Sequence, residues 1–202
     1  MTSPYKVTAD FESALCSYTG APFAVAVNSC TAALSLCLEF HPPWDNRTRL
    51  SIPRHTYVSV PMAIRRAGWK LEFRDQRWVG EYAIDPLPIW DCARRFTSGM
   101  YRKRQYQCVS FSASKILGIE QGGAILHDNP DADEWFRRMR FDGRKEGVDP
   151  SGDKFTMLGQ HCIMLPSIAA QALLRLHHLP KHNEDMPEYP YPDLSEYDWN
   201  SM

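Results

Sequence analysis

The sequence predicts an α/β fold: a three-layer α/β/α domain around a mostly parallel sheet of about six strands. Continuous apolar runs such as residues 23–27 are typical of strands buried on both faces. Stretches with helical spacing of apolar residues alternate with these runs, as expected of an α/β protein. With 202 residues, 44% of them hydrophobic, the chain is long enough for one buried core and short for two full domains.

The first half of the chain gives the clearest element borders. An apolar helical face that includes Phe11 predicts a first helix, which Gly20 ends. The strand at 23–27 follows, and Ser29 can cap a helix over 31–40. These borders predict a helix–strand–helix unit at the start of the fold.

The middle of the chain continues the alternation. A strand is expected at 50–53, followed by a helix that Ser59 caps and Gly68 ends. Apolar and charged residues alternate over 69–74, which indicates a half-exposed strand near a sheet edge. The later apolar stretches predict three further strands and two further helices, with strands at 88–90, 108–111 and 123–127 and helices at 132–141 and 167–179.

The chain changes character at Pro180. Residues 1–179 are expected to form a single domain, whereas residues 180–202 are rich in proline, tyrosine and acidic residues without a helical period. We expect an extended tail that docks on its own domain or on a partner chain.

Composition excludes several classes of protein. The net charge of −1 argues against a nucleic-acid binder. The six cysteines include no C-x-x-C pair or zinc-finger spacing, so no metal site is expected and they are typical of core residues in a reducing compartment. No secretory signal and no apolar run of roughly 18–20 residues is found. We therefore expect a soluble, cytoplasmic protein that binds no membrane.

Three candidate functional residues follow from their places beside predicted strands. Thr31 begins a helix whose free N–H groups can bind a phosphate, although an ordinary capped helix would look the same. Asp91 ends one strand and Lys115 follows another, at the sheet edge where α/β proteins bind ligands. Taken alone, a lysine at this place is usually a solvated surface residue.

The order of five short motifs is more informative than any one of them. They are Ser-Cys-Thr-Ala-Ala-Leu from Ser29, His-Thr-Tyr-Val-Ser from His55, Asp-Cys-Ala from Asp91, Ser-Phe-Ser-Ala-Ser-Lys-Ile-Leu-Gly from Ser110, and Gln-Gly-Gly-Ala from Gln121. In this order the chain resembles the DegT/StrS family of pyridoxal 5′-phosphate (PLP)-dependent sugar aminotransferases, from about Phe11 to about Leu179. The resemblance implies the large domain of a fold type I PLP enzyme.

The resemblance also implies a role for each matched residue. Lys115 would hold PLP as a Schiff base and later act as the general base. Asp91 would pair with the pyridine nitrogen, and Tyr57 would stack on the ring. The cofactor's phosphate would be held by Cys30, Thr31 and Ser110.

Four positions depart from the family pattern. Arg94 replaces a glutamine near the phenolic oxygen of PLP, where a guanidinium can still donate but adds a fixed charge. Gln121 replaces an acid before the glycine pair. His161 and Ile163 replace an asparagine and a basic residue that reach the neighbouring subunit's phosphate, and only His161 can still hydrogen-bond.

Whole segments also differ from the family pattern. The residues between Asp85 and Asp91 are too few for the crossover of helix and strand that relatives place there, a unit of roughly 30 residues or more. We expect the neighbouring strands to pair directly across this gap. The family's N-terminal substrate loop and C-terminal small domain are also expected to be absent.

These observations leave three hypotheses. The first is a minimal aminotransferase that moves an amino group from an amino acid, glutamate above all, to a keto-sugar or similar acceptor. It would be a homodimer with active sites at the subunit interface, as the resemblance implies. The second is a PLP enzyme of another reaction type, a racemase, decarboxylase or eliminase. The third is a non-catalytic binding or regulatory module, which gives no reason for an amine at Lys115.

Overall fold

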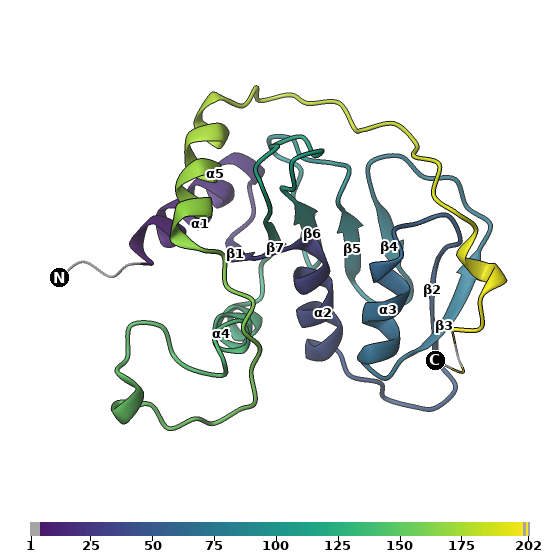
Figure 1. Cartoon of the computed structure of the whole chain (residues 1–202), viewed down its shortest axis with the longest axis horizontal. Coiled ribbons are helices and arrows are strands. Elements are labelled where there is room, and N and C mark those ends of the chain that lie inside the picture. The colour runs from purple at the N-terminus through teal and green to yellow at the C-terminus, as the bar shows by residue number, and fades with distance from the viewer. Residues whose placement is uncertain (1–4, 200, 202) are drawn as a thin grey trace.

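The main sheet of the protein is mixed. A computed structural model describes residues 5–199 and 201. Five strands form this sheet in the order β1 (Phe23–Val27), β7 (Gly123–His127), β6 (Tyr106–Ser110), β5 (Ile89–Cys92) and β4 (Tyr82–Ile84) (Figure 1). Only β5 and β6 pair in parallel, and the other three pairs are antiparallel. The α/β class is confirmed, but the expected mostly parallel sheet is wrong, because burial on both faces does not reveal strand direction.

The second sheet is a parallel pair, β2 (Arg49–Pro53) and β3 (Lys70–Arg74), joined through helix α3 (Ser59–Arg66). A single bridge links it to the main sheet: Ser51 N donates to Asp85 O at 2.8 Å, and Asp85 N donates to Ser51 O at 3.2 Å. Strand β4 therefore stands between β5 and β2. The strands on the two sides of the missing crossover, β4 and β5, pair directly as expected, in antiparallel directions, with Ile84 opposite Ile89.

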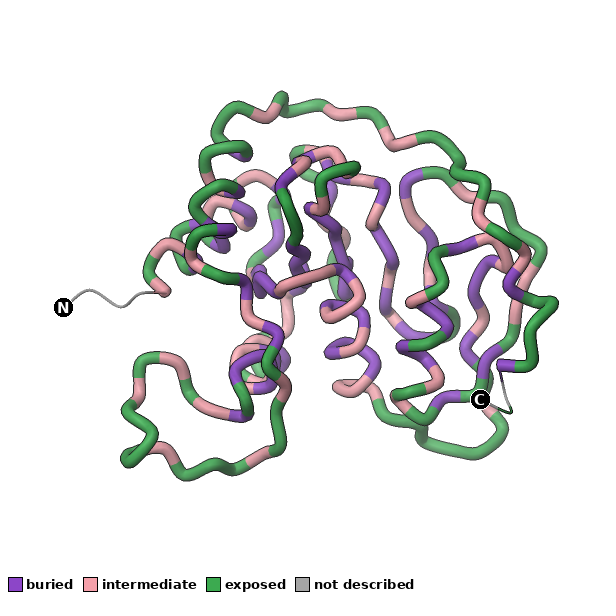
Figure 2. Tube along the Cα trace, in the orientation of Figure 1, coloured by how far each residue is buried: buried purple, intermediate pink, exposed green. Residues whose placement is uncertain are grey.

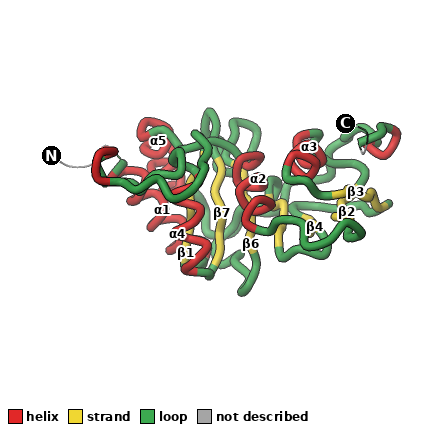
Figure 3. The backbone as a smooth tube through the Cα atoms, turned by 90° about the horizontal axis from the view of Figure 1, so that it is seen from below, coloured by secondary structure: helices red, strands yellow, loops and turns green. Residues whose placement is uncertain are grey.

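Helices cover both faces of the main sheet, as the predicted three layers require. The strands of the main sheet are largely buried (Figure 2). Alternate residues of β1 enter two separate cores: Val25 and Val27 pack in one, Ala24 and Ala26 in the other. The first core includes α2 (Cys30–Phe40), α3 and α4 (Pro130–Met139), and the second includes α1 (Lys6–Thr19) and α5 (Pro166–His178). Helices α1 and α5 lie at one end of the molecule, and the β2–β3 pair lies at the other (Figure 3).

Local sequence signals explain where the helices begin and end. The Ser29 hydroxyl accepts from Ala32 N at 3.1 Å and caps α2, as predicted. Asn129 caps α4 ahead of Pro130, whose missing N–H suits the first turn. Gly20 ends α1 in the left-handed region, at φ 82°.

A buried ionic network ties α1 to β1 and α4. The Glu12 carboxylate accepts from the backbone N–H of Ala26 at 2.8 Å and from the guanidinium groups of Arg140 at 2.5 Å and Arg137 at 2.7 Å. The side chains of Glu12 and Arg140 are only 6% and 2% exposed. Arg140 also pairs with Glu146 at 2.8 Å, which completes the network.

The C-terminal tail docks on its own domain, one of the two places expected for it. From α5 it crosses the carboxyl ends of β6 and β5 and reaches the β2–β3 pair (Figure 1). Leu194 N donates to Arg54 O at 3.0 Å, and the side chains of Leu194 and Trp199 are buried. Two short 3₁₀ helices, η1 (Pro150–Gly152) and η2 (Leu194–Glu196), complete the structure. Within the described part of the chain, no helix has the length and apolar character to cross a membrane.

Candidate active site

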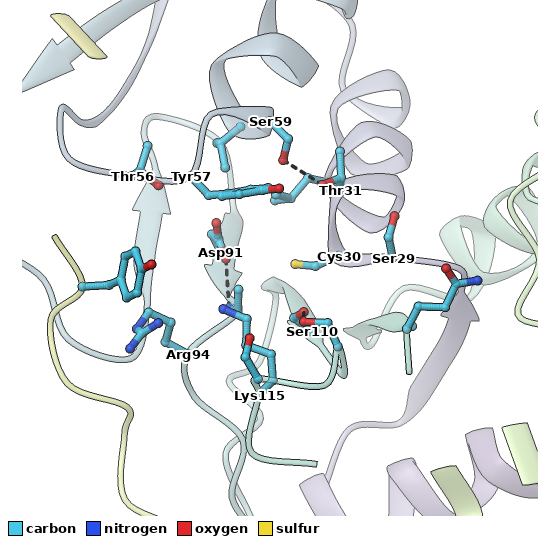
Figure 4. A pocket seen from close by; sticks show the side chains of 18 of the residues that line it. Ser29, Cys30, Thr31, Thr56, Tyr57, Ser59, Asp91, Arg94, Ser110 and Lys115 are labelled. Atoms are coloured by element: carbon cyan, nitrogen blue, oxygen red, sulfur yellow. Dashed lines mark hydrogen bonds between the residues drawn. The ribbon is translucent and has the colours of Figure 1, made fainter. Parts of the chain in front are cut away.

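A cavity of about 490 Å³ opens at the carboxyl ends of β5 and β6, beside the N-terminus of α2. Seven of the eight predicted site residues line it: Cys30, Thr31, Tyr57, Asp91, Arg94, Ser110 and Lys115. Tyr57 and Thr31 lie on one side, Lys115 and Ser110 on the other, and Asp91 lies between them (Figure 4). The prediction that Asp91 and Lys115 meet at one sheet edge is therefore confirmed.

Asp91 is held rigidly at the floor of the cavity. Its Oδ1 accepts from Ala93 N at 2.9 Å, and its Oδ2 accepts from the Tyr82 hydroxyl at 2.9 Å. Tyr82 in turn shares a 2.5 Å hydrogen bond with Thr56. Burial raises the pKa of Asp91, while the hydrogen bonds from Ala93 and Tyr82 and the charge of Lys115 oppose that shift. A positively charged group bound beside this buried carboxylate would stabilise its ionised form.

Lys115 lies in the loop that follows β6 and is half-buried. Its backbone N–H donates to Ser112 O at 2.8 Å, which fixes the loop, whereas its amine has no hydrogen-bond partner among the described residues. Burial lowers the pKa of Lys115, and the charge of Arg94 lowers it further against the opposing effect of Asp91. A lysine with a lowered pKa is a better nucleophile near neutral pH.

The first turn of α2 forms the third side of the cavity. Of its leading N–H groups, that of Ala32 is capped by Ser29, whereas those of Cys30 and Thr31 have no acceptor within the helix and form an edge that can bind an anion. Thr31 Oγ1 hydrogen-bonds Ser59 Oγ at 2.7 Å, and Ser110 Oγ lies 3.5 Å from Ser112 Oγ. Burial raises the pKa of Cys30 well above its ordinary value, so its side chain is a neutral thiol.

Gly123 of β7 lets α2 approach the sheet, and Gly123→Ala is expected to damage this edge. A Cβ there would lie 2.5 Å from Cys30 N and 2.8 Å from Ser29 O, both backbone atoms that cannot swing away. We expect a loss of about 1–3 kcal/mol in unfolding free energy and weaker binding of inorganic phosphate. Denaturant titration measures the first effect and calorimetry the second. Gly152→Ala is the control, because the nearest atom to its Cβ would be 3.8 Å away; equal losses in both variants would refute the close-approach role.

Arg94 is fixed by the C-terminal tail. Its Nε and Nη2 both donate to Pro187 O, at 3.1 and 2.7 Å, and its guanidinium carbon lies 5.5 Å from the centre of the Tyr189 ring. Its backbone oxygen accepts from Met186 N at 2.9 Å. Tyr189 and Tyr191 consequently form a wall of the cavity.

Several functional residues were not predicted from the sequence. Tyr82 hydrogen-bonds Asp91, and Thr56 hydrogen-bonds Tyr82. The only sequence signal for Tyr82 was its place in a three-residue strand, Tyr-Ala-Ile. Tyr189 and Tyr191 belong to the C-terminal tail. The sequence showed that this tail is rich in tyrosine and proline, but it did not indicate that these two residues line the cavity.

His161 does not line the cavity. Its ring is 69% exposed and pairs with Asp142, with 2.9 Å between Nδ1 and Oδ2. The sequence predicted that His161 reaches a neighbouring subunit's phosphate, and that role stays a prediction.

The residues present fit PLP. A buried carboxylate, a lysine amine without a partner and a helix N-terminus face one another across a single cavity, which matches the pyridine nitrogen, the aldehyde and the phosphate of that molecule. Among the described residues no group of histidine, cysteine, aspartate or glutamate side chains could hold a metal ion.

Solved structures share this fold. Sugar aminotransferase CalS13 from Micromonospora echinospora aligns with a TM-score of 0.69 and 17% identity over 85% of this chain and 61% of its own. AtS13 from Actinomadura melliaura aligns with a TM-score of 0.71 and 20% identity over 87% of this chain and 60% of its own. PseC from Helicobacter pylori is an aminotransferase involved in the biosynthesis of pseudoaminic acid. It aligns with a TM-score of 0.71 and 16% identity over 85% of this chain and 57% of its own. The fold is therefore that of PLP-dependent fold type I aminotransferases.

The family follows from the sequence. The family model described as the DegT/DnrJ/EryC1/StrS aminotransferase family matches residues 1–100 and 91–188. The chain belongs to this family, whose members are PLP-dependent aminotransferases. The two matched segments meet at residues 91–100, next to the place where a crossover was expected to be missing. No curated protein sequence matches the chain, and the chain spans about three fifths of the length of the solved relatives.

Proposed function

We propose that this protein is a PLP-dependent aminotransferase that uses Lys115 as its Schiff-base lysine, within a cofactor domain formed by residues 1–179. The observation that carries the proposal is the meeting of the Lys115 amine, the Asp91 carboxylate and the N-terminus of α2 in one cavity. The amino donor would be an amino acid such as glutamate, and the acceptor a keto-sugar or similar keto compound.

Each residue has a physical task in this proposal. PLP, when bound, supplies an electron sink for the bonds at the substrate's amino carbon. Asp91 keeps a proton on the pyridine nitrogen, and its bonds from Ala93 and Tyr82 hold it in position. The first turn of α2, with Thr31 and Ser110, binds the phosphate. Tyr57, 57% exposed, offers its ring face to the cavity, and Lys115 moves the proton between carbon atoms.

The decisive test is reduction of the PLP-treated protein with borohydride, followed by peptide mass spectrometry. We expect the cofactor's mass on the peptide that contains Lys115 and on no other lysine peptide. Labelling spread over exposed lysines such as Lys103, without Lys115, would refute the assignment. If Lys115 is the labelled residue, glutamate is then added to unreduced, PLP-treated protein, where transamination releases 2-oxoglutarate and racemisation, decarboxylation, elimination and simple binding do not.

The capture of PLP by Lys115 is expected to depend on pH with an inflection below 10.5, the ordinary lysine value. Only the neutral amine attacks the aldehyde, and a lowered pKa leaves more neutral amine at any pH below that value. Arg94→Gln removes one cause of the lowering and should move the inflection up, whereas Asp91→Asn should move it down. The initial rate of borohydride-trapped label against pH measures this. An inflection at or above 10.5, or shifts of the opposite sign, would contradict it.

We also propose that the protein is a homodimer with active sites at the subunit interface. Support comes from the exposed loop after α4, which presents Phe155 at 58% and Leu158 at 92% exposure, beside the exposed His161. In the dimer His161 would reach the neighbouring subunit's phosphate. Analytical ultracentrifugation should give twice the chain mass for the wild type and less for Leu158→Asp, while a monomeric wild type would refute the proposal.

A further inference from the structure

Arg94 carries a charge that the protein itself does not neutralise. The residue is only 7% exposed, yet no carboxylate among the described residues lies within ion-pair distance of its guanidinium. Its neighbour Arg95 differs, because that side chain pairs with Glu81 at 3.8 Å and with Asp185 at 2.8 Å. A buried cation without a counter-charge is costly unless a ligand provides one.

The cavity itself contains too little negative charge to supply that partner. Arg94 and Lys115 both line it, and among its described lining residues the one acidic side chain is Asp91. Both Asp91 oxygens already accept hydrogen bonds, from Ala93 and Tyr82. The cavity therefore holds an excess positive charge on the side of Arg94.

The tail fixes the orientation of this charge. Pro187 O accepts from Nε and Nη2 of Arg94, and Tyr189 lies beside the guanidinium, so one edge of the fork is held by neutral groups. Within the described part of the chain, the hydrogen-bond partners of the guanidinium are neutral groups, Pro187 O and the Tyr191 hydroxyl, so none of them supplies a counter-charge. Tyr191, which also lines the cavity, has a pKa raised by burial and lowered in part by the charge of Arg94.

We propose that Arg94, held in place by the C-terminal tail, forms an oxyanion subsite beside Lys115. An anionic oxygen there supplies the missing counter-charge and forms charge-assisted hydrogen bonds with the guanidinium. It has two possible sources, the carboxylate of the amino-acid substrate and the phenolate oxygen of the cofactor. This inference deepens the proposed function and rests on it for the identity of these two molecules.

The first arm of the test uses PLP-loaded protein and the variants Arg94→Gln, which removes the charge, and Arg94→Lys, which keeps it. If the oxyanion is the substrate's carboxylate, the apparent Kd for L-alanine rises about 10- to 100-fold in Arg94→Gln, less in Arg94→Lys, and that for ethylamine stays unchanged. If it is the phenolate, the pH titration of the bound cofactor's visible band shifts upward by about one unit without substrate. Arg95→Gln, whose side chain is already paired, is the matched control and should show neither change.

The second arm keeps the inference separate from the Lys115 assignment. In protein without PLP, malonate should raise the melting temperature of the wild type and of Arg95→Gln, but not that of Arg94→Gln. If Lys115 takes up no cofactor, the proposed function fails, and this malonate effect alone decides on the subsite. The subsite does not exist if Arg94→Gln changes neither substrate binding nor the cofactor titration in loaded protein. An unchanged malonate effect in Arg94→Gln without PLP would refute it as well.

Discussion

Lys115→Ala is expected to abolish the covalent attachment of PLP while leaving the fold intact. The variant should show no visible band from a Schiff base and no borohydride-stable label on the peptide around residue 115. The fold does not need the amine, since it has no hydrogen-bond partner among the described residues and the side chain is half-buried. The melting temperature should therefore change by less than about 2 °C.

Two further variants sharpen this result. Lys115→Arg keeps the positive charge but cannot form the Schiff base, and it should be as unlabelled as Lys115→Ala. Lys103→Ala removes an exposed lysine outside the cavity and should be labelled like the wild type. A visible band that survives in Lys115→Ala would show that another lysine holds the cofactor and would overturn the site.

Glu12→Ala is expected to lower the free energy of unfolding by about 3–5 kcal/mol, a large part of the stability of an ordinary domain. The substitution leaves the guanidinium groups of Arg137 and Arg140 and the N–H of Ala26 without their shared acceptor. Arg140 is 2% exposed and water cannot replace the lost carboxylate. Urea titration by circular dichroism measures the change.

The same helix supplies the control for this experiment. Asp10→Ala breaks the Lys6–Asp10 pair, whose side chains are 64% and 49% exposed, and should cost less than about 1 kcal/mol. Glu12→Gln keeps an acceptor for the N–H of Ala26 but removes the charge. Its loss of unfolding free energy should lie between those of Glu12→Ala and Asp10→Ala. A loss in Glu12→Ala no larger than that in Asp10→Ala would show that the buried network contributes nothing to stability.

The sequence allowed much of the site to be predicted, because its positions depend on local signals. Strands β1 and β7 lie where their apolar runs placed them, and Ser29 caps α2 as expected. Asp91 lies at the end of one predicted strand, and Lys115 follows another. The carboxyl ends of neighbouring parallel strands lie at the same edge of a sheet. Their meeting in the cavity followed from that rule together with the order of the motifs.

The remaining features depend on contacts that no local pattern encodes. The direction of β7 is set by its pairing partners, and its five residues are buried on both faces whichever way the strand runs. Strand β4 has three residues, too few for a periodicity. The bonds from Arg94 to Pro187 join residues far apart in the sequence through a carbonyl group that every residue type carries.

The place of Gly123 against the first turn of α2 has a consequence for the timing of assembly. A nascent chain that has emerged only as far as Lys115 already contains Asp91 and Lys115. It still lacks β7, the strand that joins β1 to β6 in the sheet. Such pairing between distant segments forms late in folding. The proposed phosphate-binding edge and Lys115 are therefore expected to come together only after β7 has been translated, and the proposed capture of the cofactor would follow translation of that strand rather than of the lysine.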